Sequence, residues 1–339
     1  MRCLIISMAQ EKKRIRRKKK RQKNLLIWLL VALIIIGAFI GMKFSHDKEE
    51  NLLITQSNHN KDNKSNKEEY NSADEVENSN YVLKDQDSGG NKLNNSGYLS
   101  FKEDPNAEDV AIVAENTKGL LNGTKSYPVR TDGKKVTYLT FDDGPSTTNT
   151  PQVLDILDRY NIKATFFILG SSLDASEETK EILKDIVNRG HAIGNHTYGH
   201  NYSYLYPNRV MNVDNILSDL EKNQNAMKEV LGNDFSTRVI RFPGGYWSWE
   251  GRTAMKEAKE QNGYYNVDWN ALNKDAEGKK KNAYELVQCL KESVQALGPN
   301  VDSLVVLMHD TYGKEETVKA LPEIIEYLQS ESFEFKSIK

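Results

Sequence analysis

The stretch "YLTFDDGPS", residues 138–146, decides how the rest of this chain is interpreted. Apolar and β-prone residues lead into two adjacent carboxylates, Asp142 and Asp143, and a Gly-Pro turn follows them. An apolar run that ends in a turn signal indicates a buried strand. Asp before Gly-Pro is common in turns, so the two acids could be solvated turn residues. They could also carry out two separate chemical tasks, and the remaining sequence has to distinguish these possibilities.

From Val136 onward, strand-like and helix-like segments alternate. The strand-like segments read "VTYLTF", "ATFFILG", "HAIGNH", "RVIRFP", "YYNVDWN", "SLVVLMHD" and "FEFKSI". The six segments between them carry apolar residues at helical spacing, as in Val153-Ile156-Leu157, and several end at glycine. Seven strands alternating with six helices predict a parallel α/β architecture, either an open sheet or a barrel with fewer than eight strands.

Polar residues stand at the ends of five of these strands. In parallel α/β folds the reactive groups gather at the carboxyl ends of the strands, so these residues are expected to meet at one rim. Besides the two acids of the first strand, they are His196 and His200, Arg241, Asp268 and Asp275, and His309. Each alone has an ordinary structural explanation, but together they predict a functional site. We interpret His191, which precedes the third strand, as structural.

The composition limits the classes of function. The chain has 339 residues, of which 28% are charged and 38% hydrophobic, so a folded part is expected beside a polar part. The net charge of −2 argues against a nucleic-acid-binding protein, which would show a large basic excess. The two cysteines, Cys3 and Cys289, indicate neither a disulfide framework nor a cysteine-based metal site. No obligate protein partner is evident.

The amino-terminal region predicts a membrane anchor. Residues 25–42 form an uncharged apolar run of 18 residues, which as a helix spans about 27 Å, close to the hydrocarbon thickness of a bilayer. The basic stretch 12–23 precedes it, so the positive-inside rule predicts a cytoplasmic segment 1–24 and an extracellular remainder. A cleaved signal peptide is the alternative, but the run is long for one. We expect localisation at the cell membrane, as a single-pass protein.

Residues 43–130 are expected to be an extracellular linker. Up to about residue 104 the segment is rich in Asn, Ser, Lys and Glu, and so polar a segment cannot bury enough apolar surface to fold. Residues 105–130 contain "DVAIVA" and "GLL", and they either pack onto the folded domain as an arm or remain loose. The catalytic domain is then expected to cover residues 131–339.

Four motifs, "TFDDGPS", "HTYGH", "RFPGG" and "LMHD", occur in this order in the folded region. In this they resemble the polysaccharide deacetylases of carbohydrate esterase family 4, the NodB-homology domain. A lone DDG would be a weak signal, whereas four motifs in register over the whole folded region are specific. The resemblance implies a distorted (β/α) barrel of about seven parallel strands and one divalent metal ion. The metal is expected to be zinc, with cobalt, manganese or nickel as alternatives.

The resemblance also implies roles for the residues at the rim. It assigns the metal to Asp143, His196 and His200. One carboxylate and two imidazoles leave positions open for water and substrate, as a catalytic metal requires. Asp142 is implied to be the general base that takes a proton from the attacking water. His309 is implied to be the general acid that protonates the departing amine, because a histidine can hold a proton near neutral pH.

Two further residues are implied to position this acid and base. Arg241 would hold Asp142 and keep it ionised. Many family members carry Asp-x-x-Asp-Trp near the fifth strand, and the second Asp orients the catalytic histidine. The segment "VDWNALNKDAEG" departs from that pattern. We favour Asp275 as the residue that orients His309, with Asp268 as the competing assignment.

The remaining predicted site residues would contact the substrate. The backbone N–H of Gly244 is implied to help stabilise the tetrahedral oxyanion, and Leu307 to line the pocket for the acetyl methyl group. Tyr246 and Trp247, in "GGYWSW", are expected to contact the sugar. Trp247 and Trp249 could stack on sugar rings or instead belong to the core or to a lid.

We therefore expect a metal-dependent hydrolase that removes N-acetyl groups from an acetylated cell-wall glycan. The predicted anchor and the resemblance together favour N-acetylglucosamine of peptidoglycan as the substrate. Chitin oligomers, poly-N-acetylglucosamine and acetyl-xylan remain possible with the same chemistry. A different class of function is a catalytically silent protein that binds wall glycans. The presence of the base, the three ligands and the acid argues against that alternative.

Overall fold

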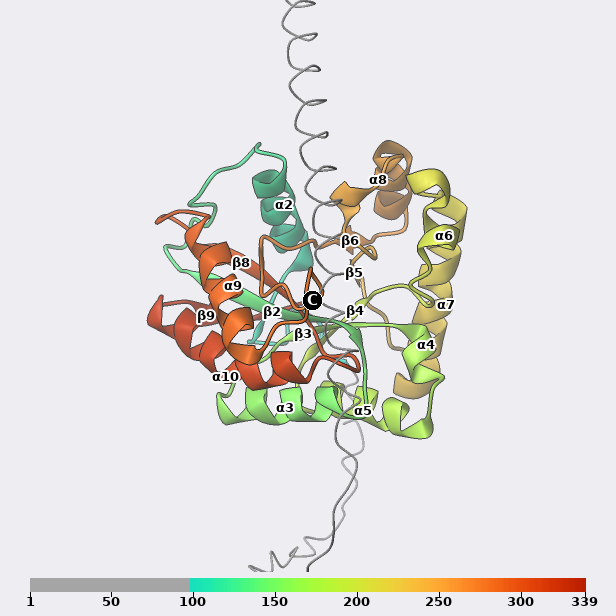
Figure 1. The fold of residues 1–339 in the computed structure, drawn as a ribbon. Helices are drawn as coiled ribbons and strands as arrows, with labels where there is room; N and C mark the ends of the chain where they lie inside the picture. Colours follow the sequence, from blue (N-terminus) through green and yellow to red (C-terminus); the bar gives the residue numbers. More distant parts are fainter. Residues whose placement is uncertain (1–97) are drawn as a thin grey trace, which may run out of the picture. The chain divides into compact units, whose positions relative to one another are not determined.

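The computed structural model describes residues 98–339, and Figure 1 labels their helices and strands. The predicted segments 1–24 and 25–42, and the linker up to residue 97, lie outside the described residues. The strands are β1 (Ala107–Glu108), β2 (Val136–Gly144), β3 (Thr165–Ile168), β4 (Ala192–Asn195), β5 (Val239–Ile240), β6 (Tyr265–Asn266), β7 (Ala271–Leu272), β8 (Ser303–His309), β9 (Glu334–Phe335) and β10 (Ser337–Ile338).

The helices follow the strands as expected for parallel α/β connections. Figure 1 shows them arranged around the strands. They are α2 (Val110–Leu121), α3 (Asn149–Arg159), α4 (Gly170–Leu173), α5 (Glu177–Asn188), α6 (Tyr202–Leu205), α7 (Val213–Leu231), α8 (Arg252–Gln261), α9 (Ala283–Gln295) and α10 (Glu315–Ser330), with short 3₁₀ turns at Pro207–Arg209 and Tyr246–Ser248.

Seven strands pair in the order β6-β5-β4-β3-β2-β8-β7, and every pairing is parallel. The prediction of an α/β fold with about seven parallel strands is confirmed, and the strands form a half-barrel. The last predicted strand, "FEFKSI", is not on this path, because β9 pairs with the start of β2 instead. Only residues 267–270 separate β6 from β7, so one segment pairs with β5 through its first part and with β8 through its second.

The two faces of β2 explain how the sheet divides the core. Alternate residues of a strand point to opposite faces. Leu139 and Phe141 belong to the apolar cluster that includes residues of α3, α5, α9 and α10. Val136 and Tyr138 belong to a second cluster with Phe167 of β3, away from those helices. Burial on both faces is why this strand reads as a nearly continuous apolar run.

Residues 105–130, for which the sequence left two possibilities, are packed against the domain. Val110 and Val113 of α2 are buried in the second cluster. β1 pairs in parallel with β10 at the other end of the described chain. Arg130 forms an ion pair with Glu108 at 2.9 Å, and the backbone N–H groups of Val129 and Arg130 donate to the carboxylate of Asp302. The arm is therefore held by apolar contacts at one end and polar contacts at the other.

The predicted membrane localisation has to be corrected. Among residues 98–339, no helix is both long enough and apolar enough to cross a membrane. The longest, α7, has 19 residues, but it carries acidic and basic side chains along with the apolar residues that it buries. Helices that cover a sheet need one apolar face only. The localisation is wrong for the part of the chain that the structure describes, and residues 25–42 lie outside that part.

The packing of α2 predicts different effects for two neighbouring residues. Val113 is 1% exposed and Ile112 is 51% exposed. Val113→Asp would bury an unpaired charge, so we expect it to lower the free energy of unfolding by about 3 kcal/mol or more. Ile112→Asp should change it by no more than about 0.5 kcal/mol. Urea unfolding of both variants measures the difference, and equal effects would show that α2 is not part of the folded core.

Candidate active site

The end of β2 departs from regular strand geometry at Asp143. This residue has a φ of 70°, which is uncommon for a residue other than glycine. The pairing with β3 shifts register between Asp142 and Gly144. Adjacent strand residues normally point to opposite faces, but this bulge brings both carboxylates to the same side. The change of direction thus begins at Asp143, one residue before the Gly-Pro turn.

Asp142 is held by a buried arginine. The Nη1 of Arg241 donates to Asp142 Oδ1 at 2.7 Å and to Thr140 Oγ1 at 2.8 Å, and its Nε donates to the carbonyl of Val267 at 2.8 Å. Arg241 is 0% exposed, and its guanidinium lies 4.0 Å from the ring centroid of Phe167. Acceptors on two sides and an aromatic ring leave this cation little freedom. Its position fixes the orientation of the carboxylate.

Three side chains that could hold a metal ion converge beside Asp142. The Oδ1 of Asp143 lies 3.4 Å from Nε2 of His196 and 3.6 Å from Nε2 of His200. The ligand atoms of these three residues lie within 4.8 Å of one another. Nδ1 of His196 is bonded to the carbonyl of Arg241 at 2.8 Å, which directs Nε2 toward the other two residues.

The arrangement fits a divalent metal ion. Oδ1 of Asp143 is buried without a hydrogen-bond partner in the described part of the chain. A buried carboxylate oxygen without a partner is costly unless a cation binds it. Separations near 3.5 Å are those of atoms that each contact a common ion at about 2.0–2.2 Å. Burial opposes the ionised form of Asp143, but the nearby His196, with smaller contributions from the charges of His200 and His309, outweighs it, and the pKa of Asp143 is held below its usual range.

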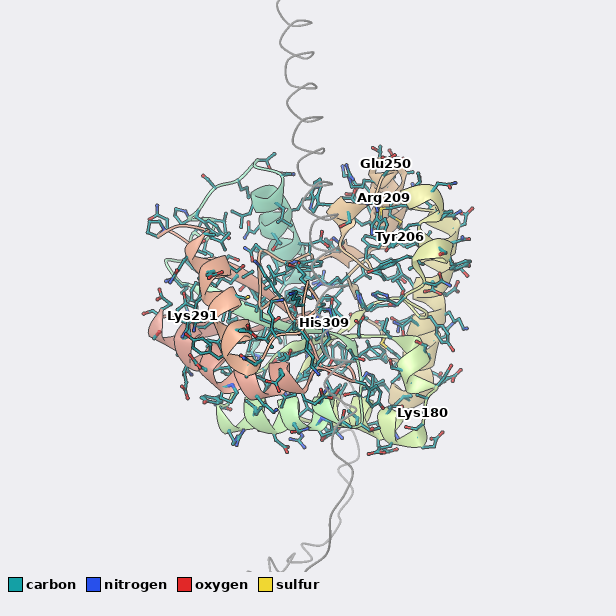
Figure 2. All side chains as sticks on the ribbon, viewed as in Figure 1. Lys180, Tyr206, Arg209, Glu250, Lys291 and His309 are labelled. Atoms are coloured by element: carbon teal, nitrogen blue, oxygen red, sulfur yellow. The ribbon has the colours of Figure 1, made fainter. Side chains whose placement is uncertain are left out.

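His309 and Asp275 form a second polar pair beside the candidate ligands. Nδ1 of His309 bonds Oδ1 of Asp275 at 2.7 Å, while Oδ2 of Asp275 accepts from the backbone N–H of His309 at 2.9 Å and from Thr317 at 2.8 Å. Burial would lower the pKa of His309, but the Asp275 carboxylate outweighs it and raises that pKa. The other nitrogen, Nε2, lies 3.9 Å from Oδ2 of Asp143. Figure 2 shows His309 near the centre of the surrounding helices.

Asp268 has different partners. Its carboxylate accepts from the backbone N–H of Tyr246 and from the side chain of Asn266. It makes no hydrogen bond to His309 among the described residues. Of the two acids that the sequence proposed for orienting His309, the structure brings Asp275 to it.

One cavity of about 280 Å³ joins these groups. Its walls include the predicted residues Gly244 and Leu307 together with Asp142, Asp143, Asp275, His196, His200 and His309, but not Asp268. Tyr246 and Trp247 do not line it. They line a separate cavity of about 360 Å³ between α2 and α8. Trp249 is buried, stacked on Tyr206 at 4.0 Å, so it belongs to the core.

Several wall residues were not singled out from the sequence. They are Tyr202, Trp269, Leu272, Lys274, Ala276 and Glu277. Tyr202 follows His200 by two residues, in a run with three tyrosines, "NYSYLYP". That proximity to a predicted ligand was the signal available in the sequence. His191, interpreted as structural, is buried away from the cavity. Its Nδ1 accepts from the backbone N–H of Ala164, and burial lowers the pKa of His191 to about 3.

Comparison with known proteins relates this chain to polysaccharide deacetylases. The family described as polysaccharide deacetylase matches residues 129–265. Two peptidoglycan-N-acetylglucosamine deacetylases of Bacillus cereus are similar to the chain. One is 34% identical over 203 residues, 59% of this chain and 66% of the relative. The other is 30% identical over 208 residues, 61% of this chain and 88% of the relative. A bifunctional xylanase/deacetylase of Pseudobutyrivibrio xylanivorans is 31% identical over 68% of this chain, which spans 33% of that protein.

Solved structures of deacetylases and esterases are also similar to this chain. A carbohydrate esterase family 4 esterase of Streptococcus mutans superposes with a TM-score of 0.60 at 36% identity, covering 69% of this chain and 92% of that structure. The catalytic domain of a peptidoglycan N-acetylglucosamine deacetylase from Eubacterium rectale superposes with a TM-score of 0.53 at 32% identity, covering 64% and 94%. The resemblance first drawn from four motifs is confirmed, and the chain belongs to the polysaccharide deacetylases of carbohydrate esterase family 4.

Proposed function

We propose that this protein hydrolyses N-acetyl groups from cell-wall polysaccharide, with N-acetylglucosamine of peptidoglycan as its substrate and a divalent metal ion, zinc in the first instance, as its cofactor. The observation that carries the proposal is the single cavity on which a held carboxylate, a three-residue ligand set and a carboxylate-bound histidine converge. These are the groups that amide hydrolysis requires. The names of the Bacillus cereus and Eubacterium rectale proteins support the choice of substrate.

The metal would be held by Asp143, His196 and His200. When bound, it would polarise the acetyl carbonyl and make a water molecule a stronger nucleophile at neutral pH. The protein's contribution is to fix the ligand atoms before the ion arrives. The bulge at Asp143 and the bond from His196 to the Arg241 carbonyl do this, because both are set by the fold and not by the ion.

Asp142 would act as the general base. Its Oδ1 is engaged by Arg241, and its Oδ2 lies 3.6 Å from Nε2 of His196, on the side of the ligand set. One oxygen is thus held in place while the other faces the site where water would stand. Asp142 would take one proton from that water as the oxygen attacks the carbonyl carbon.

His309 would act as the general acid. After the attack, the C–N bond breaks and the electron pair of the bond goes to the sugar nitrogen, which needs a proton. Nε2 of His309 faces the site, whereas Nδ1 is bound to Asp275. Asp275 would keep the ring oriented and favour its protonated form. The products are acetate and the free amine.

Two alternatives to this proposal are a different glycan substrate and a protein that binds glycan without catalysis. The Pseudobutyrivibrio relative is named a xylanase/deacetylase, which keeps acetyl-xylan as a substrate class. Comparing kcat/KM for acetate release from peptidoglycan, chitin oligomers and acetyl-xylan separates the glycans. A silent wall-binding protein would bind glycan without releasing acetate from any of them.

The proposal predicts metal-dependent acetate release. The full chain should release acetate from N-acetylglucosamine oligomers, lose the activity with a chelator and recover it with added zinc. Asp142→Asn should lower kcat by about 10²–10⁴, since it removes the base and preserves the shape of the side chain. Unaltered turnover in this variant, or in the presence of chelator, would contradict the assigned chemistry.

The two acids near the fifth strand give a second test. Asp275→Ala should lower kcat at least about tenfold, because His309 loses the carboxylate that orients it. Asp268→Ala should have the smaller effect on kcat, since its partners are Tyr246 and Asn266. Both acids are buried, so thermal unfolding of each variant has to be recorded beside acetate release. The reverse order of kcat values among folded variants would favour Asp268.

Metal content tests the ligand assignment apart from turnover. His200→Ala should reduce bound metal after dialysis by about tenfold or more, because one of three protein ligands is lost. His309→Ala is the matched control, since it changes another histidine of the same cavity that is not in the ligand set. It should retain metal and lose activity. Full metal content in His200→Ala would remove this residue from the ligand set.

A further inference from the structure

Tyr202 lies on the wall of the catalytic cavity beside the proposed ligands. It is the first residue of α6, it is 45% exposed, and its ring centroid lies 5.1 Å from that of His200. The edge of Trp249 contacts it at 5.2 Å between centroids, and Trp249 in turn stacks on Tyr206 at 4.0 Å. Arg209 lies over Trp249 at 5.3 Å; Tyr206 and Arg209 are labelled in Figure 2. The rings of Trp249 and Tyr206 therefore support the Tyr202 ring.

The hydroxyl of Tyr202 is close to the backbone of Gly244. A Cβ atom added to Gly244 would lie 3.2 Å from this hydroxyl oxygen. Gly244 has a φ of 75°, and in the described part of the chain its N–H donates to no other group. The Tyr202 hydroxyl likewise has no hydrogen-bond partner among residues 98–339. Two donors without partners thus stand close together on the wall of a cavity that holds the candidate metal site.

Donors placed in this way suit an oxygen that becomes negatively charged. As the water oxygen bonds to the carbonyl carbon, the π pair of the C=O bond moves onto the carbonyl oxygen. When the C–N bond breaks, that pair returns to form the carbonyl of acetate. Preorganised donors that face the developing charge stabilise the transition state more than the planar substrate.

We propose that Tyr202 is a catalytic residue whose hydroxyl, together with the Gly244 N–H, hydrogen-bonds the oxyanion of the acetyl group. The inference rests on the proposed deacetylase function. Tyr202 keeps its proton throughout, because it donates a hydrogen bond only. Two other roles are distinguishable: a ring that stacks on a sugar needs no hydroxyl, and a ring that only supports His200 needs none either.

Removal of the hydroxyl alone tests the role. Tyr202→Phe keeps the ring and its contacts with His200 and Trp249, so metal content should be unchanged. We expect kcat for acetate release to fall about tenfold to a hundredfold, with KM within about twofold, since the lost bond forms mainly in the transition state. Tyr204→Phe is the matched control, because Tyr204 is on the same helix, is 42% exposed and does not line the cavity. It should match the unmodified protein. Unaltered kcat in Tyr202→Phe would overturn the proposal.

A binding measurement separates this inference from the proposed function. An N-acetylglucosamine oligomer whose acetamide is replaced by a methylphosphonamidate carries a tetrahedral, anionic group in place of the planar amide. Its Kd, measured by calorimetry on the metal-loaded protein, should rise at least tenfold in Tyr202→Phe, while the Kd of the unmodified oligomer stays the same. Equal Kd values of the analogue for both proteins would refute the role of Tyr202. The Kd comparison can be made even if the protein releases no acetate. Absence of acetate release would contradict the proposed function but not the role of Tyr202 in binding the anionic group.

Discussion

The buried ion pair between Arg241 and Asp142 is the interaction on which the site depends. Arg241 contacts Thr140 on β2 and the carbonyl of Val267 in the segment between β6 and β7, and its own carbonyl binds His196. One residue therefore links β2, the segment that pairs with both β5 and β8, and a proposed metal ligand. Breaking a buried pair of this kind typically costs about 3–5 kcal/mol, because an uncompensated charge is left behind. The ion pair therefore holds its own geometry, and it also positions the two groups that Arg241 contacts, Thr140 and His196.

The positions of the main polar groups could be predicted because parallel strands all present their carboxyl ends at one rim. Asp142 and Asp143 lie at the end of β2 and His309 at the end of β8, after clear apolar runs, and His196 directly follows β4. The choice between Asp268 and Asp275 was different, since both stand near the fifth strand. It depends on where the chain leaves β5 and joins β8, and that crossing is decided by pairing with distant strands. The residues of the segment alone do not say which distant strands it pairs with.

The positions of the aromatic residues also depend on contacts with residues that are distant in the sequence. Trp247 and Trp249 are two positions apart, yet Trp249 is buried against Tyr206, and Trp247 lines another cavity. Tyr202 reaches the catalytic cavity because α6 is a single turn braced by Trp249, a contact between residues far apart in sequence. The arm at residues 105–130 was ambiguous for a related reason. Its short apolar stretch "DVAIVA" is too brief to indicate burial, and its partners come from β2, β3 and β8.

Asp142 and Asp143 are adjacent carboxylates, and the fold gives them different surroundings. Two carboxylates at one site resist ionising together, because like charges a few ångströms apart repel. Asp142 is compensated by a guanidinium from the core, which occupies one oxygen permanently. Asp143 instead faces the cavity beside Nε2 of His196 and Nε2 of His200, and its buried Oδ1 lacks a hydrogen-bond partner in the described chain. The first acid is thus anchored to the protein and suited to accept a proton, and the second is suited to bind a cation. The division of roles between the two neighbours follows from what each faces: the Arg241 guanidinium binds Asp142, whereas Oδ1 of Asp143 has no cationic side chain of the core bound to it.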